Sequence, residues 1–177
     1  MQQPARNILD YDPAVLADAY RLTRGQPLLL QLLGATLINR CNEQARQGET
    51  RSDYVDTNDF AAAVEGVVRA ETNAAFENHW DDSDAATHRV LSALAWATDE
   101  AARSQLAIAG LESAMAETRL FLPREQTFRI LERLAGDEIL ERDGPTYRFW
   151  VPLYRRWVAW RWPPERVREE AVPTPER

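Results

Sequence analysis

The chain has 177 residues, of which 45% are hydrophobic, enough for the packed core of one domain or of two small ones. Its formal net charge of −7 argues against sequence-independent binding to nucleic acid, because such binding needs a positive field. All 21 basic residues are arginines. The absence of lysine excludes a phosphate-loop lysine, a Schiff-base lysine and a lysine general base.

The sequence shows no sign of a disulfide, a signal peptide or a membrane span. Cys41 is the only cysteine, so no internal disulfide can form and a cytoplasmic setting is expected. Residues 1–10 lack the basic and apolar regions of a signal peptide. The longest apolar run, residues 27–33, is too short to span a bilayer. We therefore expect an acidic, soluble protein without a membrane segment.

Helical spacing dominates the N-terminal part of the chain. Asp12-Pro13 predicts a helix start, with an N-cap residue followed by proline. Gly25 suits the left-handed residue that ends this helix, and Pro27 suits the first turn of a second helix, which should run to about Gln47. The apolar residues expected on one face of the first helix are Val15, Leu16, Ala19, Tyr20 and Leu22.

A third helix is expected to start at residue 57 or 58, with Asp56 or Thr57 as its cap, and to run towards His79. The residues that should form its buried face are Phe60, Val64, Val67, Val68 and Phe76. The polar run Trp80–Asp84 then marks a boundary. A new helix should begin at residue 83 or 84.

In the C-terminal part of the chain the pattern of apolar residues changes from helical to β-type spacing. Residues 99–119 predict one or two helices with Gly110 as the break, and Leu122-Pro123 starts a further helix that Gly136 ends. The inward-facing residues of that helix should be Phe128, Ile130, Leu131 and Leu134. Short β-type runs at 139–142 and 147–150, around Asp143-Gly144-Pro145, predict a hairpin. Pro152 opens a last helix to about Trp162, and residues 165–177 should be a solvated, charged tail.

The helix–Gly–x–Pro–helix joint at residues 22–34 resembles the lid subdomain of AAA+ and STAND-type P-loop ATPases. The later order, helices and then a hairpin followed by Pro152, resembles the winged helix that STAND-like ATPases carry after their nucleotide-binding core. The resemblance implies a mainly α fold. A helical lid bundle at 1–80 would precede a winged helix-turn-helix domain with a small β-hairpin wing at 81–165, and a tail would occupy 166–177.

In these families the Gly-x-Pro turn lies near the base of the bound nucleotide. The resemblance therefore implies that four residues border the adenine and ribose of an ATP held mainly by an upstream core, namely Arg24, Gly25, Gln26 and Pro27. Many AAA+ lids have a basic residue after the proline, whereas this chain has Leu28, as is usual in STAND lids. STAND winged helices often present a histidine near the end of the wing, where this chain has residues 150–152 and no histidine.

A winged helix can also bind DNA. The residues of its presumed recognition helix that suit phosphates and guanine edges are Arg124, Gln126, Arg129 and Arg133. Glu125 and Glu132 share that helix and nearly balance its charge, so a solvated face is favoured over DNA recognition. The aromatic cluster at 147–162 could stack bases, but the helical spacing of Leu153, Trp157 and Trp160 favours closure of the core.

No catalytic or metal-binding spacing connects His79, His88 and Cys41, and Walker A and Walker B motifs are absent. We therefore expect a non-catalytic C-terminal lid and winged-helix region of an AAA+/STAND-like ATPase. It would contribute to ATP and Mg binding only in the intact protein, and to regulation or partner contact. Expected partners are the upstream core, other proteins, and a second copy of the chain through apolar surface. The alternative is a DNA-binding winged-helix transcriptional regulator or a protein-interaction adaptor.

Overall fold

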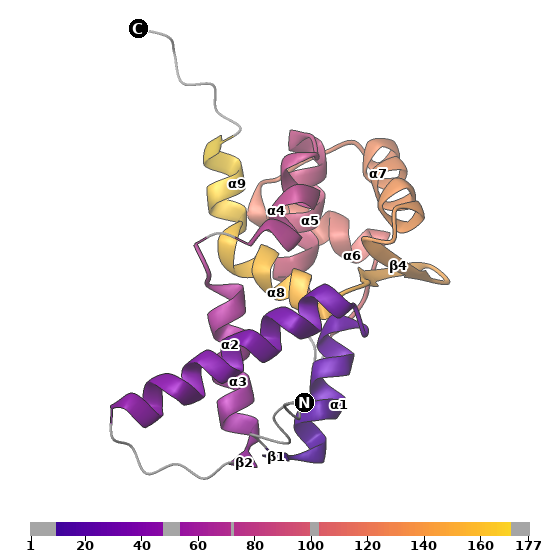
Figure 1. Cartoon of the computed structure of the whole chain (residues 1–177). Helices are drawn as coiled ribbons and strands as arrows, with labels where there is room; N and C mark the ends of the chain where they lie inside the picture. The colour runs from indigo at the N-terminus through magenta and orange to yellow at the C-terminus, as the bar shows by residue number, and fades with distance from the viewer. Residues whose placement is uncertain (1–9, 48–53, 72, 100–102, 171–177) are drawn as a thin grey trace, which may run out of the picture. The chain divides into compact units, whose positions relative to one another are not determined.

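The computed structural model describes residues 10–47, 54–71, 73–99 and 103–170. The chain is mainly helical, with a small antiparallel sheet, as the sequence predicted. It divides into two compact units, Met1–Glu71 and Thr72–Arg177, each described by itself (Figure 1). The domains predicted from the sequence meet between residues 80 and 81.

The first unit contains three helices among its described residues, and side-chain caps fix where two of them begin. The elements are β1 (Asp10–Tyr11), α1 (Pro13–Thr23), α2 (Pro27–Arg46), β2 (Tyr54–Val55) and α3 (Thr57–Val68). Asp12 caps α1 by accepting the Ala14 N–H at 2.8 Å, as predicted. Asp56 caps α3 by accepting the N–H groups of Asn58 and Asp59 at 2.8 and 2.9 Å. The two short strands pair in parallel, with Tyr11 opposite Val55.

The buried side chains of the first unit come mainly from α2 and α3, which pack against each other. Gly66 allows this approach, because a Cβ atom there would lie 3.1 Å from the Thr36 side chain. On α1 the predicted apolar face was wrong in part, since Leu16 and Tyr20 are 57% and 66% exposed. Only Val15 and Leu22 of the five residues expected there are fully buried.

The predicted third helix is interrupted. α3 ends at Val68, and a separate helix, α4 (Ala74–Asp81), begins after Asn73, whose φ of −141° and ψ of 80° are not helical. Asparagine favours caps and turns over helix interiors, which explains why the helix does not continue. Phe76 therefore belongs to the second unit, where its ring lies 5.6 Å from Tyr154 and 5.8 Å from Trp157.

The second unit begins with α4 and contains further helices and three short strands. The further elements are α5 (Ala85–Ala97), β3 (Leu106–Ala107), α6 (Ile108–Thr118), α7 (Arg124–Gly136), β4 (Leu140–Asp143), β5 (Thr146–Phe149), α8 (Pro152–Arg161) and α9 (Pro164–Glu170). The strand order is β3-β5-β4, with both pairs antiparallel. The hairpin was predicted, but β3 was not, because a strand of two residues shows no alternation.

The hairpin turns at Gly144, which has a φ of 56° and is followed by Pro145. The hairpin is tied to α7 through one carboxylate. The Tyr147 hydroxyl donates to Glu132 Oε1 at 2.6 Å, and Arg142 Nη1 donates to Glu132 Oε2 at 2.8 Å. Burial, with the bond to Glu132, raises the pKa of Tyr147 to about 12, so this hydroxyl stays a donor at neutral pH.

The expectation of a solvated tail from residue 165 was wrong, because α9 is helical. Val167 is only 4% exposed, and the Arg166 guanidinium lies 4.1 Å from the ring centroid of Trp162. Trp162 stacks on Trp80 at 4.8 Å, and Trp80 stacks on His88 at 4.1 Å. Pro164 occupies the first position of α9, where proline suits a helix start rather than a stop. Residues 171–177 lie outside the described residues.

The start of α5 gives a pH-dependent prediction. Hydrogen bonds from the Thr87 hydroxyl and the Thr87 N–H lower the pKa of Asp84 from its ordinary value of 3.8. Because the pKa is lowered in the folded state, the stabilisation is complete at pH values above the ordinary pKa of 3.8. It is lost as the pH falls through the lower pKa of the folded state. Asp84→Ala should cost about 0.5–2 kcal/mol at pH 7 and less on acidification.

Urea unfolding of the chain and of Asp84→Ala at pH 7 and at about pH 2.5 measures this difference. Asp84→Asn serves as the control, because an amide keeps a capping oxygen but cannot titrate over this range. An equal cost for Asp84→Ala at both pH values would contradict the assignment.

None of the helices in the described part of the chain is both long and apolar enough to cross a membrane.

Candidate functional site

The turn between α1 and α2 contains all four residues that the sequence singled out. Arg24 and Gly25 both have left-handed backbones, with φ values of 53° and 72°. The Gln26 N–H donates to the Thr23 carbonyl at 3.1 Å. Pro27 then opens α2. The left-handed Gly25 and the position of Pro27 agree with the prediction, whereas the left-handed Arg24 was not predicted.

Thr23 fixes this turn to α1. Its side chain is fully buried, and its hydroxyl donates to the Ala19 carbonyl at 2.7 Å. The same oxygen accepts the Gly25 N–H at 3.2 Å. One hydroxyl thus joins the last turn of the helix to the first residue beyond Arg24. The sequence analysis gave Thr23 no role, although a threonine that precedes a left-handed pair can bond locally in this way.

Tyr20 explains why residue 25 is glycine. A Cβ atom on Gly25 would lie 2.7 Å from Tyr20 Cε2, closer than such atoms approach, and the positive φ would strain any L side chain as well. The Tyr20 ring nevertheless remains 66% exposed, and Leu28, just after Pro27, is 62% exposed. The turn therefore carries an outward aromatic ring and an outward aliphatic side chain.

The side chains at this turn suit contact with a ligand. None of the four predicted residues is a nucleophile or a general base, so what these four side chains offer a ligand is contact. The exposed Tyr20 ring and Leu28 side chain suit a planar apolar group. Arg24 is the positively charged residue among the four.

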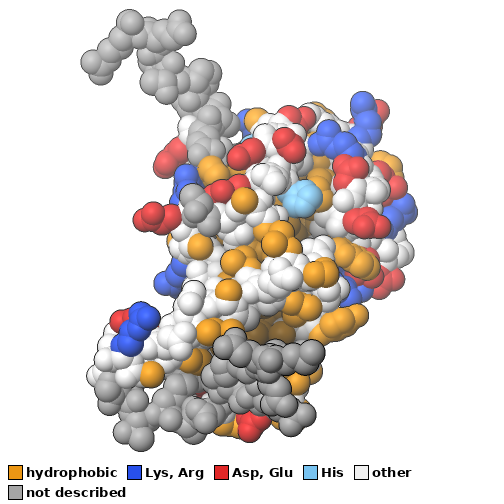
Figure 2. All heavy atoms as spheres, in the orientation of Figure 1, with side chains coloured by type: hydrophobic (Ala, Val, Ile, Leu, Met, Phe, Trp, Pro, Cys, Tyr) orange, Lys and Arg blue, Asp and Glu red, His pale blue; other side chains and the backbone are white. Residues whose placement is uncertain are grey.

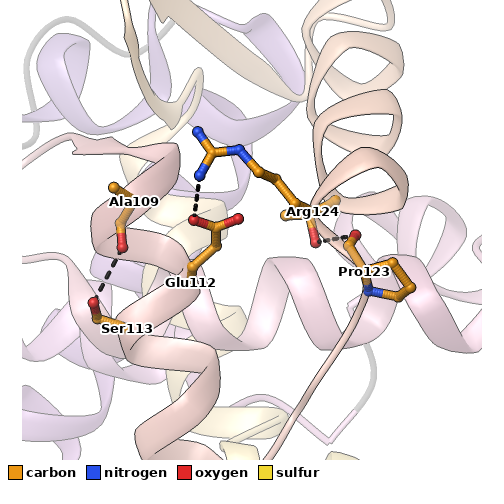
Figure 3. A network of polar contacts seen from close by, with 6 residues as sticks. Ala109, Glu112, Ser113, Pro123 and Arg124 are labelled. Atoms are coloured by element: carbon orange, nitrogen blue, oxygen red, sulfur yellow. Dashed lines mark hydrogen bonds and ion pairs between the residues drawn. The ribbon is translucent and has the colours of Figure 1, made fainter.

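In the second predicted site, on α7, two of the three arginines are paired with glutamates. Arg124 Nη1 lies 2.8 Å from Glu112 Oε2 on α6 (Figure 3), and Arg129 Nη2 lies 2.8 Å from Glu125 Oε1. Arg133 donates instead to the Thr87 hydroxyl on α5. Exposed ion pairs of this kind contribute little to stability, about 0–1 kcal/mol, but they cancel the local positive field. On the face that Figure 2 shows, arginine and acidic side chains are interspersed.

Gln126 is exposed on the same helix, and so is Phe128, which is 43% exposed. The prediction that Phe128 faces inward was therefore wrong, whereas Ile130, Leu131 and Leu134 are buried as expected. The four predicted polar residues share α7, and the positive charges of Arg124 and Arg129 are each paired with a glutamate.

The aromatic cluster is mostly packed inside the second unit. Tyr147, Phe149, Tyr154 and Trp157 are each at most 5% exposed, whereas Trp160 is 39% exposed. Burial raises the pKa of the Tyr154 hydroxyl well above its usual range. Four of these rings therefore form core and present no free face for a base to stack on. Of the three residues whose helical spacing favoured closure of the core, Leu153 and Trp157 are buried, whereas the prediction for Trp160 was wrong.

The compensated charges lead to a prediction about nucleic acid. Binding of duplex DNA at low salt should be no tighter than that of an unrelated acidic protein, and Arg129→Ala should leave it unchanged, because Arg129 is already paired. Fluorescence anisotropy with labelled duplex, over a range of salt concentrations, measures this. A steep loss of affinity with rising salt, weakened further by Arg129→Ala or Arg133→Ala, would establish the DNA-binding alternative instead.

Comparison of this chain with models of protein families, with curated proteins and with solved structures finds no match.

Proposed function

We propose that this chain is the non-catalytic lid and winged-helix region of a P-loop ATPase of the AAA+/STAND kind. The observation that supports this most is the α1–α2 turn. There a helix is followed by the left-handed Gly25, and Pro27, two residues further on, opens the next helix. The exposed Tyr20 ring and Leu28 side chain beside this turn fit a nucleotide base.

The order of elements in the second unit supports the winged-helix part of the proposal. A helix, α5, is followed by the short strand β3, two helices and the β4–β5 hairpin. Strand β5 lies between β3 and β4 in the sheet. In this reading α7 is the helix that would recognise a partner, and the hairpin is the wing, held to α7 through Glu132.

The proposal divides the work between this chain and an upstream core. The chain has no lysine and no phosphate loop, so the core would hold the phosphates and the Mg ion, and ATP bound there would supply the hydrolytic chemistry. Tyr20, Arg24, Gly25 and Leu28 would border the base and ribose. The second unit would report or restrain closure of the lid through contacts of its surface. DNA is a disfavoured partner, because Arg124 and Arg129 of α7 are paired with glutamates.

Hydrogen exchange tests the site in the polypeptide that cells make. The protein is isolated from source cells with an antibody to this chain, and exchange is followed with and without ATP and Mg. The proposal predicts slower exchange in residues 20–28 when ATP is present, with little change in α6 as an internal control. Equal exchange in residues 20–28 at saturating ATP would contradict a nucleotide contact at this turn.

A further inference from the structure

Helix α2 has an exposed and uncharged face opposite the one that it buries. Its buried residues recur at intervals of four, at Leu29, Leu33, Leu37 and Cys41. On the other side, exposed residues alternate at intervals of three and four, as in the contact stripe of a coiled coil. These stripe residues are Leu28, Gln31, Ala35, Ile38 and Asn42. An exposed helix face usually carries charged side chains, but the chain has no charged residue between Arg24 and Arg40.

A glycine in the middle of α2 has no role in the packing of the described chain. Glycine destabilises a helix interior relative to alanine. A Cβ atom on Gly66 of α3 would lie 3.1 Å from the Thr36 side chain, so that glycine serves the contact of α3 with α2. A Cβ atom on Gly34 would have no described neighbour within 4 Å. Gly34 and Ala35 together leave the surface of α2 low, so another helix can approach its backbone closely.

The charges on this face favour a second copy of the chain as its occupant. A face with charges of one sign repels its own copy across a two-fold axis, and the α2 stripe has no charge to repel. The net charge of −7 opposes contact between copies over the rest of the surface. An uncharged face is therefore the part of this acidic chain best suited to meet itself.

The order of residues in the stripe matches its own reverse. In an antiparallel pair of α2 helices, Leu28 of one copy faces Ile38 of the other, and Gln31 faces Ala35. A two-fold axis repeats both contacts. Large apolar side chains thus meet each other, and each long side chain meets a short one. A parallel pair would place Gln31 against Gln31 and leave the short Ala35 side chains opposite each other.

The size of the stripe predicts a weak dimer. Residues 28–42 span about 21 Å along the helix axis. The two large apolar side chains, Leu28 and Ile38, are 62% and 47% exposed. Two such stripes bury on the order of 1,000 Å² in total, at the lower limit for specific interfaces. We therefore expect a dissociation constant of about 10–100 μM, which makes association depend on concentration.

We infer that α2 is a self-association surface, through which two copies of this chain form an antiparallel, two-fold symmetric helix pair. Gly34 and Ala35 lie at the close approach, and the pairs of Leu28 with Ile38 supply the apolar contact. The dimer covers Leu28, which the proposed nucleotide contact also uses, so the two occupants exclude each other. Self-association is therefore measured without nucleotide, and its failure leaves the nucleotide proposal untouched.

Sedimentation equilibrium of the full chain over about 1–500 μM measures the association. The mass should rise with concentration from 20.2 kDa towards twice that value. The rise should begin at lower concentration in high salt, because salt screens the repulsion between two acidic copies and the contact itself is uncharged. A mass of 20.2 kDa over the whole range would overturn the inference.

Ile38→Glu should weaken association at least tenfold, because it places a charge against Leu28 of the other copy. Leu16→Glu is the matched control. Leu16 is 57% exposed, but it belongs to α1 and lies outside the stripe, so its change should leave association as it is. Thermal unfolding at about 1 μM, where the chain is monomeric, establishes that both variants are folded. Equal weakening by the two variants, or none by Ile38→Glu, would show that α2 is not the contact.

Mixed variants test the antiparallel pairing and remain informative if Ile38→Glu does not fold. Gln31→Glu and Ala35→Arg should each weaken self-association, because each brings like charges close to the two-fold axis. An equimolar mixture should associate about tenfold more tightly than either variant alone, since the introduced glutamate of one copy faces the introduced arginine of the other. A mixture that associates no more tightly than its components would contradict this pairing and overturn the inference.

Discussion

Trp80→Ala should destabilise the second unit by about 3–5 kcal/mol, a large part of the stability of a small domain. Trp80 is 2% exposed and lies at the centre of an aromatic stack. Its ring stacks on His88 at 4.1 Å and on Trp162 at 4.8 Å, and meets the edge of Trp157 at 6.2 Å. Removal of the indole leaves a cavity between α4, α5 and the C-terminal part of α8.

Urea unfolding monitored by circular dichroism measures this effect, and Trp96→Ala is its matched control. Trp96 belongs to the same unit but is 48% exposed, so its loss should cost about 1 kcal/mol or less. Trp80→Phe keeps part of the stack and should destabilise the unit by an intermediate amount. It replaces Trp80→Ala in the measurement if the alanine variant does not fold. Equal costs for Trp80→Ala and Trp96→Ala would contradict the central role of Trp80.

Gly25→Val should destabilise the first unit by about 2–3 kcal/mol, because it combines two penalties. A β-branched residue is strained at the φ of 72° that Gly25 adopts. Its Cβ would also lie 2.7 Å from Tyr20 Cε2, which forces the tyrosine ring to move. Hydrogen exchange of α1 and α2, read separately from the second unit, measures the loss.

The two penalties can be separated. In the background Tyr20→Ala the steric part disappears, so Gly25→Ala should cost less there than in the parent chain, and the difference is a coupling energy. Gly34→Ala is the control, because no neighbour lies within 4 Å of its Cβ position and α2 is helical there; it should be neutral or slightly stabilising. A Gly25→Val chain with unchanged exchange in α1 and α2 would show that the turn has another conformation.

Local backbone preferences explain which parts of the fold could be predicted. The helix ends were predictable because each depends on residues only a few positions apart in the sequence. This holds for the caps Asp12 and Asp84 and for the turn residues Gly25 and Pro27. The hairpin was predictable for the same reason, since Gly144 supplies the positive φ that its tight turn needs.

Features that depend on distant partners could not be predicted. The composition of α9 resembles that of a solvated tail. It is nevertheless helical, because Val167 is buried in the rest of the unit and Arg166 packs on Trp162. Strand β3 exists only through its pairing with β5, and is too short to leave a pattern. Phe128 has the spacing of a core residue, but the neighbouring elements leave its part of α7 uncovered.

The candidate site shows the same division. The turn residues were predicted because they are adjacent in the sequence, and the role of Tyr20 was missed because helical spacing alone placed it on a buried face. On α7 the arginines could be identified from the sequence, but the residues that they contact could not. The bond from Arg133 to Thr87 joins residues that are 46 positions apart. Side-chain contacts across such separations depend on how helices pack, and helical periodicity does not specify that.

The size of the native gene product tests the central proposal most directly. An antibody raised against this chain is used to blot extract of source cells, with the purified 20.2 kDa chain as the size standard, and the captured protein is sequenced by mass spectrometry. The account predicts a much larger polypeptide that contains a phosphate-binding loop upstream of these residues. A native product of 20.2 kDa would leave no room for a nucleotide-binding core and would contradict the assignment of this chain as the lid and winged helix of an ATPase.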